Sequence, residues 1–397
     1  MQDKVVVKDL YKIFGPEPDR ALELLDQGLS KAEIFEQTRT TVGVQKADFS
    51  IREGEVFVVM GLSGSGKSTL VRMLNRLIEP TRGQVIVDGV DITQMSKQEL
   101  ITMRRRSMSM VFQSFALMPH KSVAENAAFG LEVSGMSKAQ RRERALKALD
   151  TVGLAANADS YPDELSGGMK QRVGLARALA TDAPILLMDE AFSALDPLIR
   201  TEMQDELVRL QSTHAHTIVF ISHDLDEAIR IGDRIAIMEG GAIVQIGTPE
   251  EIVTNPADDY VRSFFHGVDV SKVFSAGDIA SDRAITVFER TGVNVRAALA
   301  QLHERGHSLG IVIDTDRHYR GMVSLNSLAE AGRDSAHSRW EDAFLTQVQP
   351  AAADTELSEV LGQVTASEFP VPIVDAEGRY RGIVDKTVLL QTLDKTT

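Results

Sequence analysis

The chain has 397 residues, of which 43% are hydrophobic and 25% charged, with a formal net charge of −14. This length provides for two or three domains with cores of their own, and the acidic balance argues against nucleic-acid binding through overall charge. The absence of cysteine excludes disulfides, thiol catalysis and zinc-thiolate sites.

The first residues, "MQDKVVVKDLYKIFG", alternate like a strand and lack the apolar centre of a signal peptide. The apolar run in "EVFVVMGL" is far too short for a membrane span. We therefore expect any role at a membrane to depend on a partner protein.

Strands and helices alternate over the first part of the chain. Strands are predicted at 4–8 and 55–60, the second of them of the buried type, and further buried-type strands at 185–189, 217–222 and 234–238. Helical patterns follow at 67–78, 166–180, 197–211 and 224–231. This alternation predicts an α/β fold with a mainly parallel sheet, in a domain that we place at 1–275.

Two segments interrupt the alternation. Residues 16–43 are predicted to form a short helical pair, because Ser30 and Glu33 have capping-box spacing and Gly28 suits the end of the preceding helix. Residues 96–165 are rich in charges and helix formers. Together with the next helix they predict a helical subdomain of about 96–180.

An internal repeat marks the C-terminal part. "IVIDTDRHYRGMVS" (311–324) matches "PIVDAEGRYRGIVD" (372–385) at a shift of 61 residues. This repeat predicts a duplicated β-α-β-β-α unit. We place this second domain at 276–397, with halves at about 276–335 and 336–397.

A glycine-rich loop, "GLSGSGKST" (61–69), lies between a predicted buried strand and an amphipathic helix. It fits the pattern Gly-x4-Gly-Lys-Ser/Thr of phosphate-binding loops, with Gly61, Gly66, Lys67 and Ser68 at the defining positions. Lys67 would reach the β and γ phosphates, and Ser68 would offer its hydroxyl to Mg²⁺. The alternative, a glycine turn with an unrelated lysine, is disfavoured by the strand before the loop and the helix after it.

Polar residues follow two other buried strands. In "ILLMDE", Asp189 is positioned to hold Mg²⁺ and Glu190 to orient or deprotonate the attacking water. The alternative is a carboxylate pair that caps a strand. His223 ends "TIVFISH" at the edge where parallel strands present ligands, and it could donate a hydrogen bond to the γ phosphate; a purely structural histidine is the alternative.

Taken in order, these motifs resemble the ATP-binding subunits of ABC transporters over about residues 4–265. The resemblance adds Gln113, "LSGGMKQ" (165–171) and "SALD" (193–196). Several stretches are similar to the ATPases of glycine betaine/proline importers, including "MVFQSFALMPHKSV" and "DEAFSALDPLIRTEMQDEL". The C-terminal repeat resembles a tandem CBS pair, so the implied fold is a P-loop ABC ATPase domain followed by a tandem CBS α+β domain.

The resemblance implies a role for each site residue. Glu190 would be the general base, with His223 and Gln113 as further catalytic residues, and Ser68, Gln113 and Asp189 would bind Mg²⁺. Phe14 would stack on adenine, with Tyr11 as the nearby alternative. The ATP-binding set would comprise Phe14, Gly61, Ser63, Gly64, Gly66, Lys67, Ser68, Thr69, Ser166, Gly167, Gly168 and Asp196.

The resemblance also implies that the functional unit is a homodimer. Ser166, Gly167 and Gly168 of one chain would face the ATP held by the other, with the positive end of the following helix directed at the γ phosphate. Asp196 would lie at the contact between the two subunits. The glycines can equally be read as the loop before a helix that Ser166 caps, and both readings can hold together.

The implied function is ATP hydrolysis that energises import of compatible solutes such as glycine betaine or proline. Partners would be transmembrane permease subunits and, indirectly, a solute-binding protein, with the chain peripheral at the cytoplasmic face of the inner membrane and no nucleic acid bound. The alternative is a soluble ABC-type ATPase that acts on nucleic acid or ribosomes.

The CBS pair is expected to sense osmotic or ionic conditions, or else to serve as a structural brace. It departs from nucleotide-binding CBS pairs, because the ribose-binding aspartate is missing after both Gly-x-Val strands. Ser324 and Ser327 stand at the two positions in the first half, and Asp385 and Val388 in the second.

Overall fold

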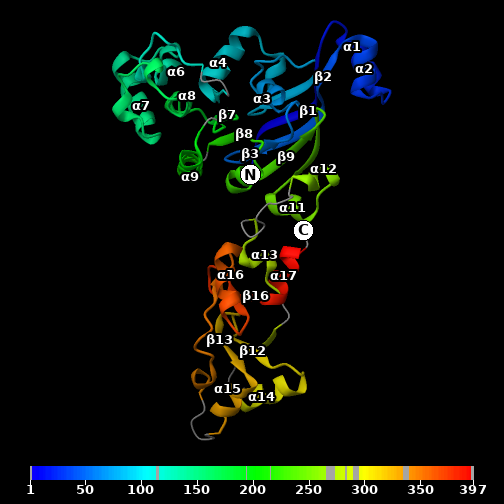
Figure 1. The fold of residues 1–397 in the computed structure, drawn as a ribbon, viewed down its shortest axis with the longest axis vertical. Helices are drawn as coiled ribbons and strands as arrows, with labels where there is room; N and C mark the ends of the chain where they lie inside the picture. The colour runs from blue at the N-terminus through cyan, green and yellow to red at the C-terminus, as the bar shows by residue number, and fades with distance from the viewer. Residues whose placement is uncertain are drawn as a thin grey trace. The chain divides into compact units, whose positions relative to one another are not determined.

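The computed structural model describes residues 2–112, 116–193, 195–214, 216–264, 273–281, 284–288, 295–333 and 339–394 (Figure 1). The chain divides into two compact units, Met1–Phe264 and Phe265–Thr397. The change in sequence character predicts this boundary later, after residue 275. None of the described helices is long and apolar enough to cross a membrane.

A six-stranded sheet in the order β10-β9-β3-β8-β7-β6 organises the first unit. Neighbours from β9 to β6 are parallel, and β10 is antiparallel to β9. Every residue of β3, β7 and β8 is buried, as expected for strands covered on both faces. The bounds are β3 (Val56–Met60), β6 (Met108–Val111), β7 (Ile185–Asp189), β8 (Thr217–Ile221), β9 (Arg234–Glu239) and β10 (Ala242–Gly247).

A second sheet was not anticipated from the sequence. Four antiparallel strands lie in the order β2-β1-β4-β5. They are β1 (Asp3–Phe14), β2 (Thr41–Arg52), β4 (Arg82–Val87) and β5 (Val90–Asp91). The expectation of one mainly parallel sheet therefore describes only part of the unit. The antiparallel sheet was missed because its strands β1 and β2 are separated in sequence by a long insertion.

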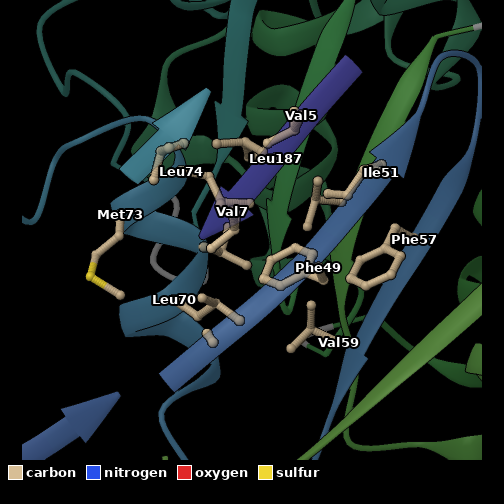
Figure 2. Close-up of a cluster of buried hydrophobic side chains, with 14 of the residues drawn as sticks. Val5, Val7, Phe49, Ile51, Phe57, Val59, Leu70, Met73, Leu74 and Leu187 are labelled. Atoms are coloured by element: carbon tan, nitrogen blue, oxygen red, sulfur yellow. The ribbon is translucent and has the colours of Figure 1, made fainter. Parts of the chain in front are cut away.

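Both sheets contribute to one hydrophobic core around α3 (Lys67–Leu74). Figure 2 shows side chains of β1, β2, β3, α3 and β7 converging there. The rings of Phe49 and Phe57 stack with centroids 5.3 Å apart and planes 2° from parallel. This core fixes where α3 begins, and so where the phosphate loop ends.

The insertion after β1 forms the predicted helical pair, α1 (Pro18–Asp26) and α2 (Lys31–Thr38). The capping box of Ser30 and Glu33 is present, and Gly28 has a φ of +85°, in the left-handed region. A small core joins the pair to strands β1 and β2 through Ile13, Ala21, Leu24, Ile34 and Val42.

The region 96–180 is mostly helical, with one exception. Residues Met108–Val111 form β6 and pair in parallel with β7, within the segment that the sequence predicts to be mostly helical. Their apolar side chains and the free edge of β7 explain the strand. The helices are α4 (Lys97–Ser107), α5 (Val123–Ala127), α6 (Phe129–Val133), α7 (Lys138–Thr151) and α8 (Gly167–Ala180), with short 3-10 turns η1 (Ile92–Gln94), η2 (Ala155–Asn157) and η3 (Pro162–Glu164).

The remaining helices of this unit are α9 (Pro197–His214), α10 (Leu225–Ile231), α11 (Pro249–Thr254) and α12 (Asp259–Ser263). Helix α3 ends at Leu74, four residues before its predicted end. The left-handed conformation of Arg76, with a φ of +56°, turns the chain away from the helix axis.

The second unit shows the predicted duplication, β-α-β-β-α twice. The first copy comprises β11 (Ile285–Phe288), α14 (Val295–Glu304), β12 (Leu309–Ile313), β13 (Tyr319–Ser324) and α15 (Leu325–Ala331). The second comprises β14 (Ala351–Ala352), α16 (Leu357–Ala366), β15 (Val371–Val374), β16 (Tyr380–Val384) and α17 (Lys386–Asp394). Helix α13 (Ala276–Ile279) precedes them, and η5 (Glu341–Ala343) lies between them.

The two copies are joined through equivalent turns. Tyr319 N donates to Gly378 O at 3.0 Å, and Tyr380 N donates to Arg317 O at 2.9 Å. In each copy the first strand pairs in parallel with the second, which pairs antiparallel with the third.

Candidate active site

The phosphate loop connects the end of β3 at Met60 to the start of α3 at Lys67. Gly61, Gly64 and Gly66 have φ values of +146°, +80° and +102°, which residues with a Cβ rarely adopt. A Cβ on Gly66 would also lie 2.5 Å from the carbonyl oxygen of Gly43. A tight loop of this kind at a helix start is the arrangement that cradles phosphates.

Lys67 lies folded along this loop and is 6% exposed. Its Nζ donates to the carbonyl oxygens of Gly61 at 2.7 Å and Leu62 at 3.0 Å. Burial lowers the pKa of Lys67, and the nearby carboxylates of Glu190 and Asp189 oppose that shift. The ammonium group therefore stands at the loop, opposite two acidic groups, where a phosphate would bind.

Ser68 and Asp189 meet as the sequence predicts. The Ser68 hydroxyl donates to Asp189 Oδ1 at 2.8 Å, and Asp189 is fully buried at the end of β7. A hydroxyl and a carboxylate side by side are oxygen ligands that suit Mg²⁺. The pair therefore fits the metal that the sequence analysis assigns to it.

Arg72 was missed by the sequence analysis. Its Nη2 donates to Asp189 Oδ2 at 2.9 Å, so the buried carboxylate has a cationic partner within the chain. Arg72 lies one helical turn after Ser68 on α3, and this i, i+4 spacing was the available signal.

Glu190 and His223 follow neighbouring strands, β7 and β8, and both line one cavity of about 10 Å³. Glu190 has a φ of +49°, a conformation that is costly for a residue with a side chain and that clusters at functional sites. The Ser193 hydroxyl donates to the Glu190 carbonyl oxygen at 2.9 Å. The strand ends thus bring the two predicted residues to one place.

Phe14 ends β1 and is 41% exposed, with Lys12 Nζ 5.0 Å from its ring centre. Tyr11, the alternative, is 5% exposed, and the Arg82 guanidinium covers its ring at 4.1 Å. Of these two aromatic rings, the ring of Phe14 is therefore the one that is open to a ligand.

The "LSGG" segment starts α8 within the helical group, whereas the phosphate loop starts α3 between the sheets (Figure 1). Ser166 is exposed and caps α8, accepting a hydrogen bond from Met169 N at 3.3 Å. Asp196 is exposed too, and its Oδ1 accepts from Ile199 N at 3.1 Å in the first turn of α9. Gln113 lies outside the described residues, as does Ala194 of "SALD".

Comparison with known proteins gives consistent matches. A model of the ABC transporter family matches residues 44–193. The glycine betaine/proline betaine transport system ATP-binding protein of Salmonella typhimurium is 57% identical over 396 residues, which cover 100% of this chain and 98% of that protein. The glycine betaine transport ATP-binding protein of Bacillus subtilis is 49% identical over 390 residues, which cover 98% of this chain and 92% of that protein.

Among solved structures, the dimeric structure of a bacterial ABC transporter cassette is 31% identical, with a TM-score of 0.54. The match covers 62% of this chain and 98% of the cassette. The same cassette in a post-hydrolysis state, bound to ADP and Pi, matches equally well.

Proposed function

Because this chain belongs to the ATP-binding subunits of ABC transporters, we propose that its ATP hydrolysis drives the import of glycine betaine or a related compatible solute. The relatives named above are ATP-binding proteins of transport systems, which disfavours the alternative of a soluble ATPase acting on nucleic acid. The observation that carries the assignment is the pairing of Ser68 with Asp189 beside the buried ammonium of Lys67.

ATP would be held by residues of three segments. Gly61, Ser63, Gly64, Gly66, Lys67, Ser68 and Thr69 would surround the phosphates, and Phe14 would stack on adenine. Ser68 and Asp189, together with Gln113, would hold Mg²⁺, which neutralises phosphate charge when bound. The exposure of the Phe14 ring and the conformation of the loop support these roles.

Glu190 would take the proton of the attacking water, and His223 would donate a hydrogen bond to the γ phosphate. Both residues line one cavity, which supports these roles. Asp189 lies one residue before Glu190, so the proton acceptor and the metal ligands would act on the same phosphate.

A second copy of the chain would complete each site. Ser166, Gly167 and Gly168 start a helix away from the chain's own phosphate loop, and a helix N-terminus favours an anion. Asp196 would contact the partner. The dimeric form of the similar cassette supports this arrangement.

The remaining partners would be permease subunits, with a solute-binding protein acting indirectly through them. The chain would lie at the cytoplasmic face of the inner membrane. The absence of a membrane-spanning helix among the described residues agrees with attachment through such partners.

We assign the second unit as a tandem CBS pair with a regulatory role in sensing ionic or osmotic conditions. Its duplicated topology supports this assignment. The hydroxyls of Ser324 and Ser327 cap α15 reciprocally, and Asp385 Oδ1 accepts from Val388 N at 2.7 Å. Because these groups are engaged as helix caps, we do not expect them to bind ribose.

Deleting residues 265–397 tests this regulatory role. The first unit has its own core, so we expect the shortened chain to hydrolyse ATP while its rate loses the salt dependence of the full chain. An unchanged salt response would leave the CBS pair as a structural brace.

Glu190→Gln tests the main proposal. A general base contributes roughly 10²- to 10⁴-fold, so we expect hydrolysis to fall by at least 10²-fold while ATP binding persists. Glu53→Gln, a change at an exposed carboxylate in the loop before β3, serves as the matched control. A normal rate in Glu190→Gln would contradict the assigned base.

The solute is tested by reconstituting the chain with its permease subunits in vesicles. Uptake of betaine, proline, choline and carnitine would then be compared. We expect ATP-dependent uptake of betaine, and uptake of none of the four would contradict the proposed substrate class.

A further inference from the structure

Helices α9 and α10 contribute residues to the cavity that Glu190 and His223 line. The two helices are joined by polar side chains to which the proposed hydrolysis mechanism assigns no role. Helix α9 follows the "SALD" loop, and α10 follows His223. These two segments are the ones that would touch the partner subunit and the γ phosphate. A connection between them would therefore join the dimer contact to the chemistry.

The inner link is buried. Gln204 of α9 is 5% exposed, and its Nε2 donates to Glu227 Oε1 at 3.0 Å. The other oxygen of Glu227 accepts a hydrogen bond from the Ser222 hydroxyl. Glu227 is 9% exposed and belongs to α10, so it connects α9 to the residue directly before His223.

Ser222 extends this link to both sides of His223. It is 1% exposed, and its Oγ accepts a hydrogen bond from Asp224 N at 3.0 Å. One hydroxyl, Ser222 Oγ, therefore contacts the backbone after His223 and belongs to the residue before it. The same hydroxyl donates to Glu227, so the hydrogen bonds connect both neighbours of His223 to Glu227.

The outer link uses Arg200, one turn before Gln204 on the same face of α9. Its Nη2 donates to Leu195 O at 3.3 Å, within the "SALD" loop. Its Nη1 lies 3.7 Å from Asp224 Oδ2, directly after His223. Arg200 therefore contacts the residues next to both Asp196 and His223.

Both links open onto the hydrolysis site. Arg200, Ser222, Asp224 and Glu227 line the same cavity as Glu190 and His223. A shift of α9 relative to β8 would change these contacts, and a misplacement of about 1 Å at a reacting group can cost on the order of 10²-fold in rate.

We propose that Arg200, Gln204 and Glu227 are positioning residues that hold His223 at a fixed position relative to the "SALD" loop. Contact of Asp196 with the second subunit then determines the position of His223. The inference rests on the proposed function, because it assigns His223 to the γ phosphate and Asp196 to the dimer contact. None of the three residues belongs to the phosphate loop, so their contribution falls on turnover and not on nucleotide binding.

Arg200→Gln and Glu227→Leu test the proposal in the full chain. We expect kcat to fall by about tenfold or more in each, because His223 loses its fixed position. The KM for ATP and the affinity for a fluorescent ATP analogue should change by less than about twofold. Glu227→Gln should keep kcat within about twofold, because its amide can donate to Ser222 Oγ while its oxygen accepts from Gln204.

Arg230→Gln is the matched control. Arg230 Nη2 lies 2.6 Å from Asp205 Oδ1, which joins α10 to α9 on the exposed side without touching Ser222 or the "SALD" loop. We expect wild-type kcat and an unchanged thermal midpoint in this variant. A wild-type kcat in both Arg200→Gln and Glu227→Leu would overturn the proposal.

Equal losses of nucleotide affinity and kcat in the two test variants would also overturn it, since the links would then be structural only. Where Glu227→Leu fails to fold, Arg200→Gln and Glu227→Gln decide the result. Absence of hydrolysis in both the wild-type chain and Arg230→Gln would instead contradict the proposed function itself.

Discussion

Asp189 combines complete burial with a proposed role in metal binding. It is fully buried, and its two oxygens accept hydrogen bonds from Ser68 and Arg72. A buried carboxylate without a partner would cost several kcal/mol, so Arg72 keeps the charge tolerable while the position facing Ser68 remains suited to a cation.

Glu227 gives a prediction at the same scale. Burial raises the pKa of Glu227 above the ordinary value of 4.5. Between the Glu227 pKa of the unfolded chain and the higher Glu227 pKa of the folded chain, the unfolded chain has released a proton that the folded chain retains. The free energy of unfolding therefore falls as the pH rises through this range. Glu227→Gln has no such titration, and we expect it to gain stability relative to wild type from pH 4.5 to pH 8.

The measurement is the thermal midpoint of the unfolding transition that ATP raises, since that transition belongs to the ATP-binding unit. Glu53→Gln, a change at an exposed carboxylate, is the control. Parallel pH curves for wild type and Glu227→Gln would contradict the expectation.

At the scale of elements, the site depends on where strands end and helices begin. Strands β3, β7 and β8 are parallel neighbours, so the residues that follow them, Gly61, Glu190 and Ser222, gather at one edge of the sheet. Helices α3 and α8 each start with glycine-rich turns, but α8 belongs to the helical group. Under the proposed function, this separation leaves the second turn to bind the ATP held by another copy of the chain.

Asn126 of α5 offers a test of the helical group. It is fully buried, accepts a hydrogen bond from Met118 N at 2.8 Å, and donates to the carbonyl oxygens of Met118, Lys121 and Ser122. Asn126→Ala would remove the hydrogen bonds to Met118 N and Lys121 O, whereas the carbonyl oxygens of Met118 and Ser122 keep the backbone donors Lys121 N and Asn126 N. We expect a loss of about 2–3 kcal/mol of stability, measured by urea unfolding.

Gln98→Ala, a change at an exposed site on α4, should cost less than about 0.5 kcal/mol. Equal unfolding curves for Asn126→Ala and wild type would show that the turn at 118–122 does not need this side chain.

At the scale of the whole molecule, the two compact units have separate cores. The ATP-binding unit contains a phosphate loop and a "LSGG" turn on different elements, which supports the proposal that two chains function as a pair. The second unit is built from two similar halves that pair through equivalent turns. Under the proposed function, the chain combines one hydrolysis site that a second copy would complete with a second unit that would regulate it.

Ser166→Arg tests the pairing of chains. We expect this variant to bind ATP through Lys67 yet to lose hydrolysis, because a long cation at an exposed helix start would block the approach of a partner. Dimer formation with ATP, measured by sedimentation in a Glu190→Gln background, should be lost as well. Ser137→Arg makes the same change at the exposed N-cap of α7, which has no part in the proposed site, and serves as the control. Hydrolysis that survives in Ser166→Arg would contradict the shared site.

Local patterns were sufficient for much of the architecture. The strands of the parallel sheet are continuous apolar runs, the capping box at Ser30 is a four-residue signal, and the repeat predicts the duplicated topology. The resemblance to ABC transporter ATPases, carried by short ordered motifs, is confirmed by relatives that match the whole chain. Each of these signals lies within a contiguous stretch, where spacing alone determines structure.

The tertiary structure alone decided the rest. Strands β1 and β2 pair across the helical insertion, β6 joins the sheet beside β7, and Arg72 reaches an aspartate 117 positions away. The links among Gln204, Glu227 and Ser222 likewise span α9, α10 and β8. Residues far apart in sequence meet only when the whole chain packs, so the phosphate loop could be recognised from its own residues, whereas the partners that hold Asp189 and His223 in place could not.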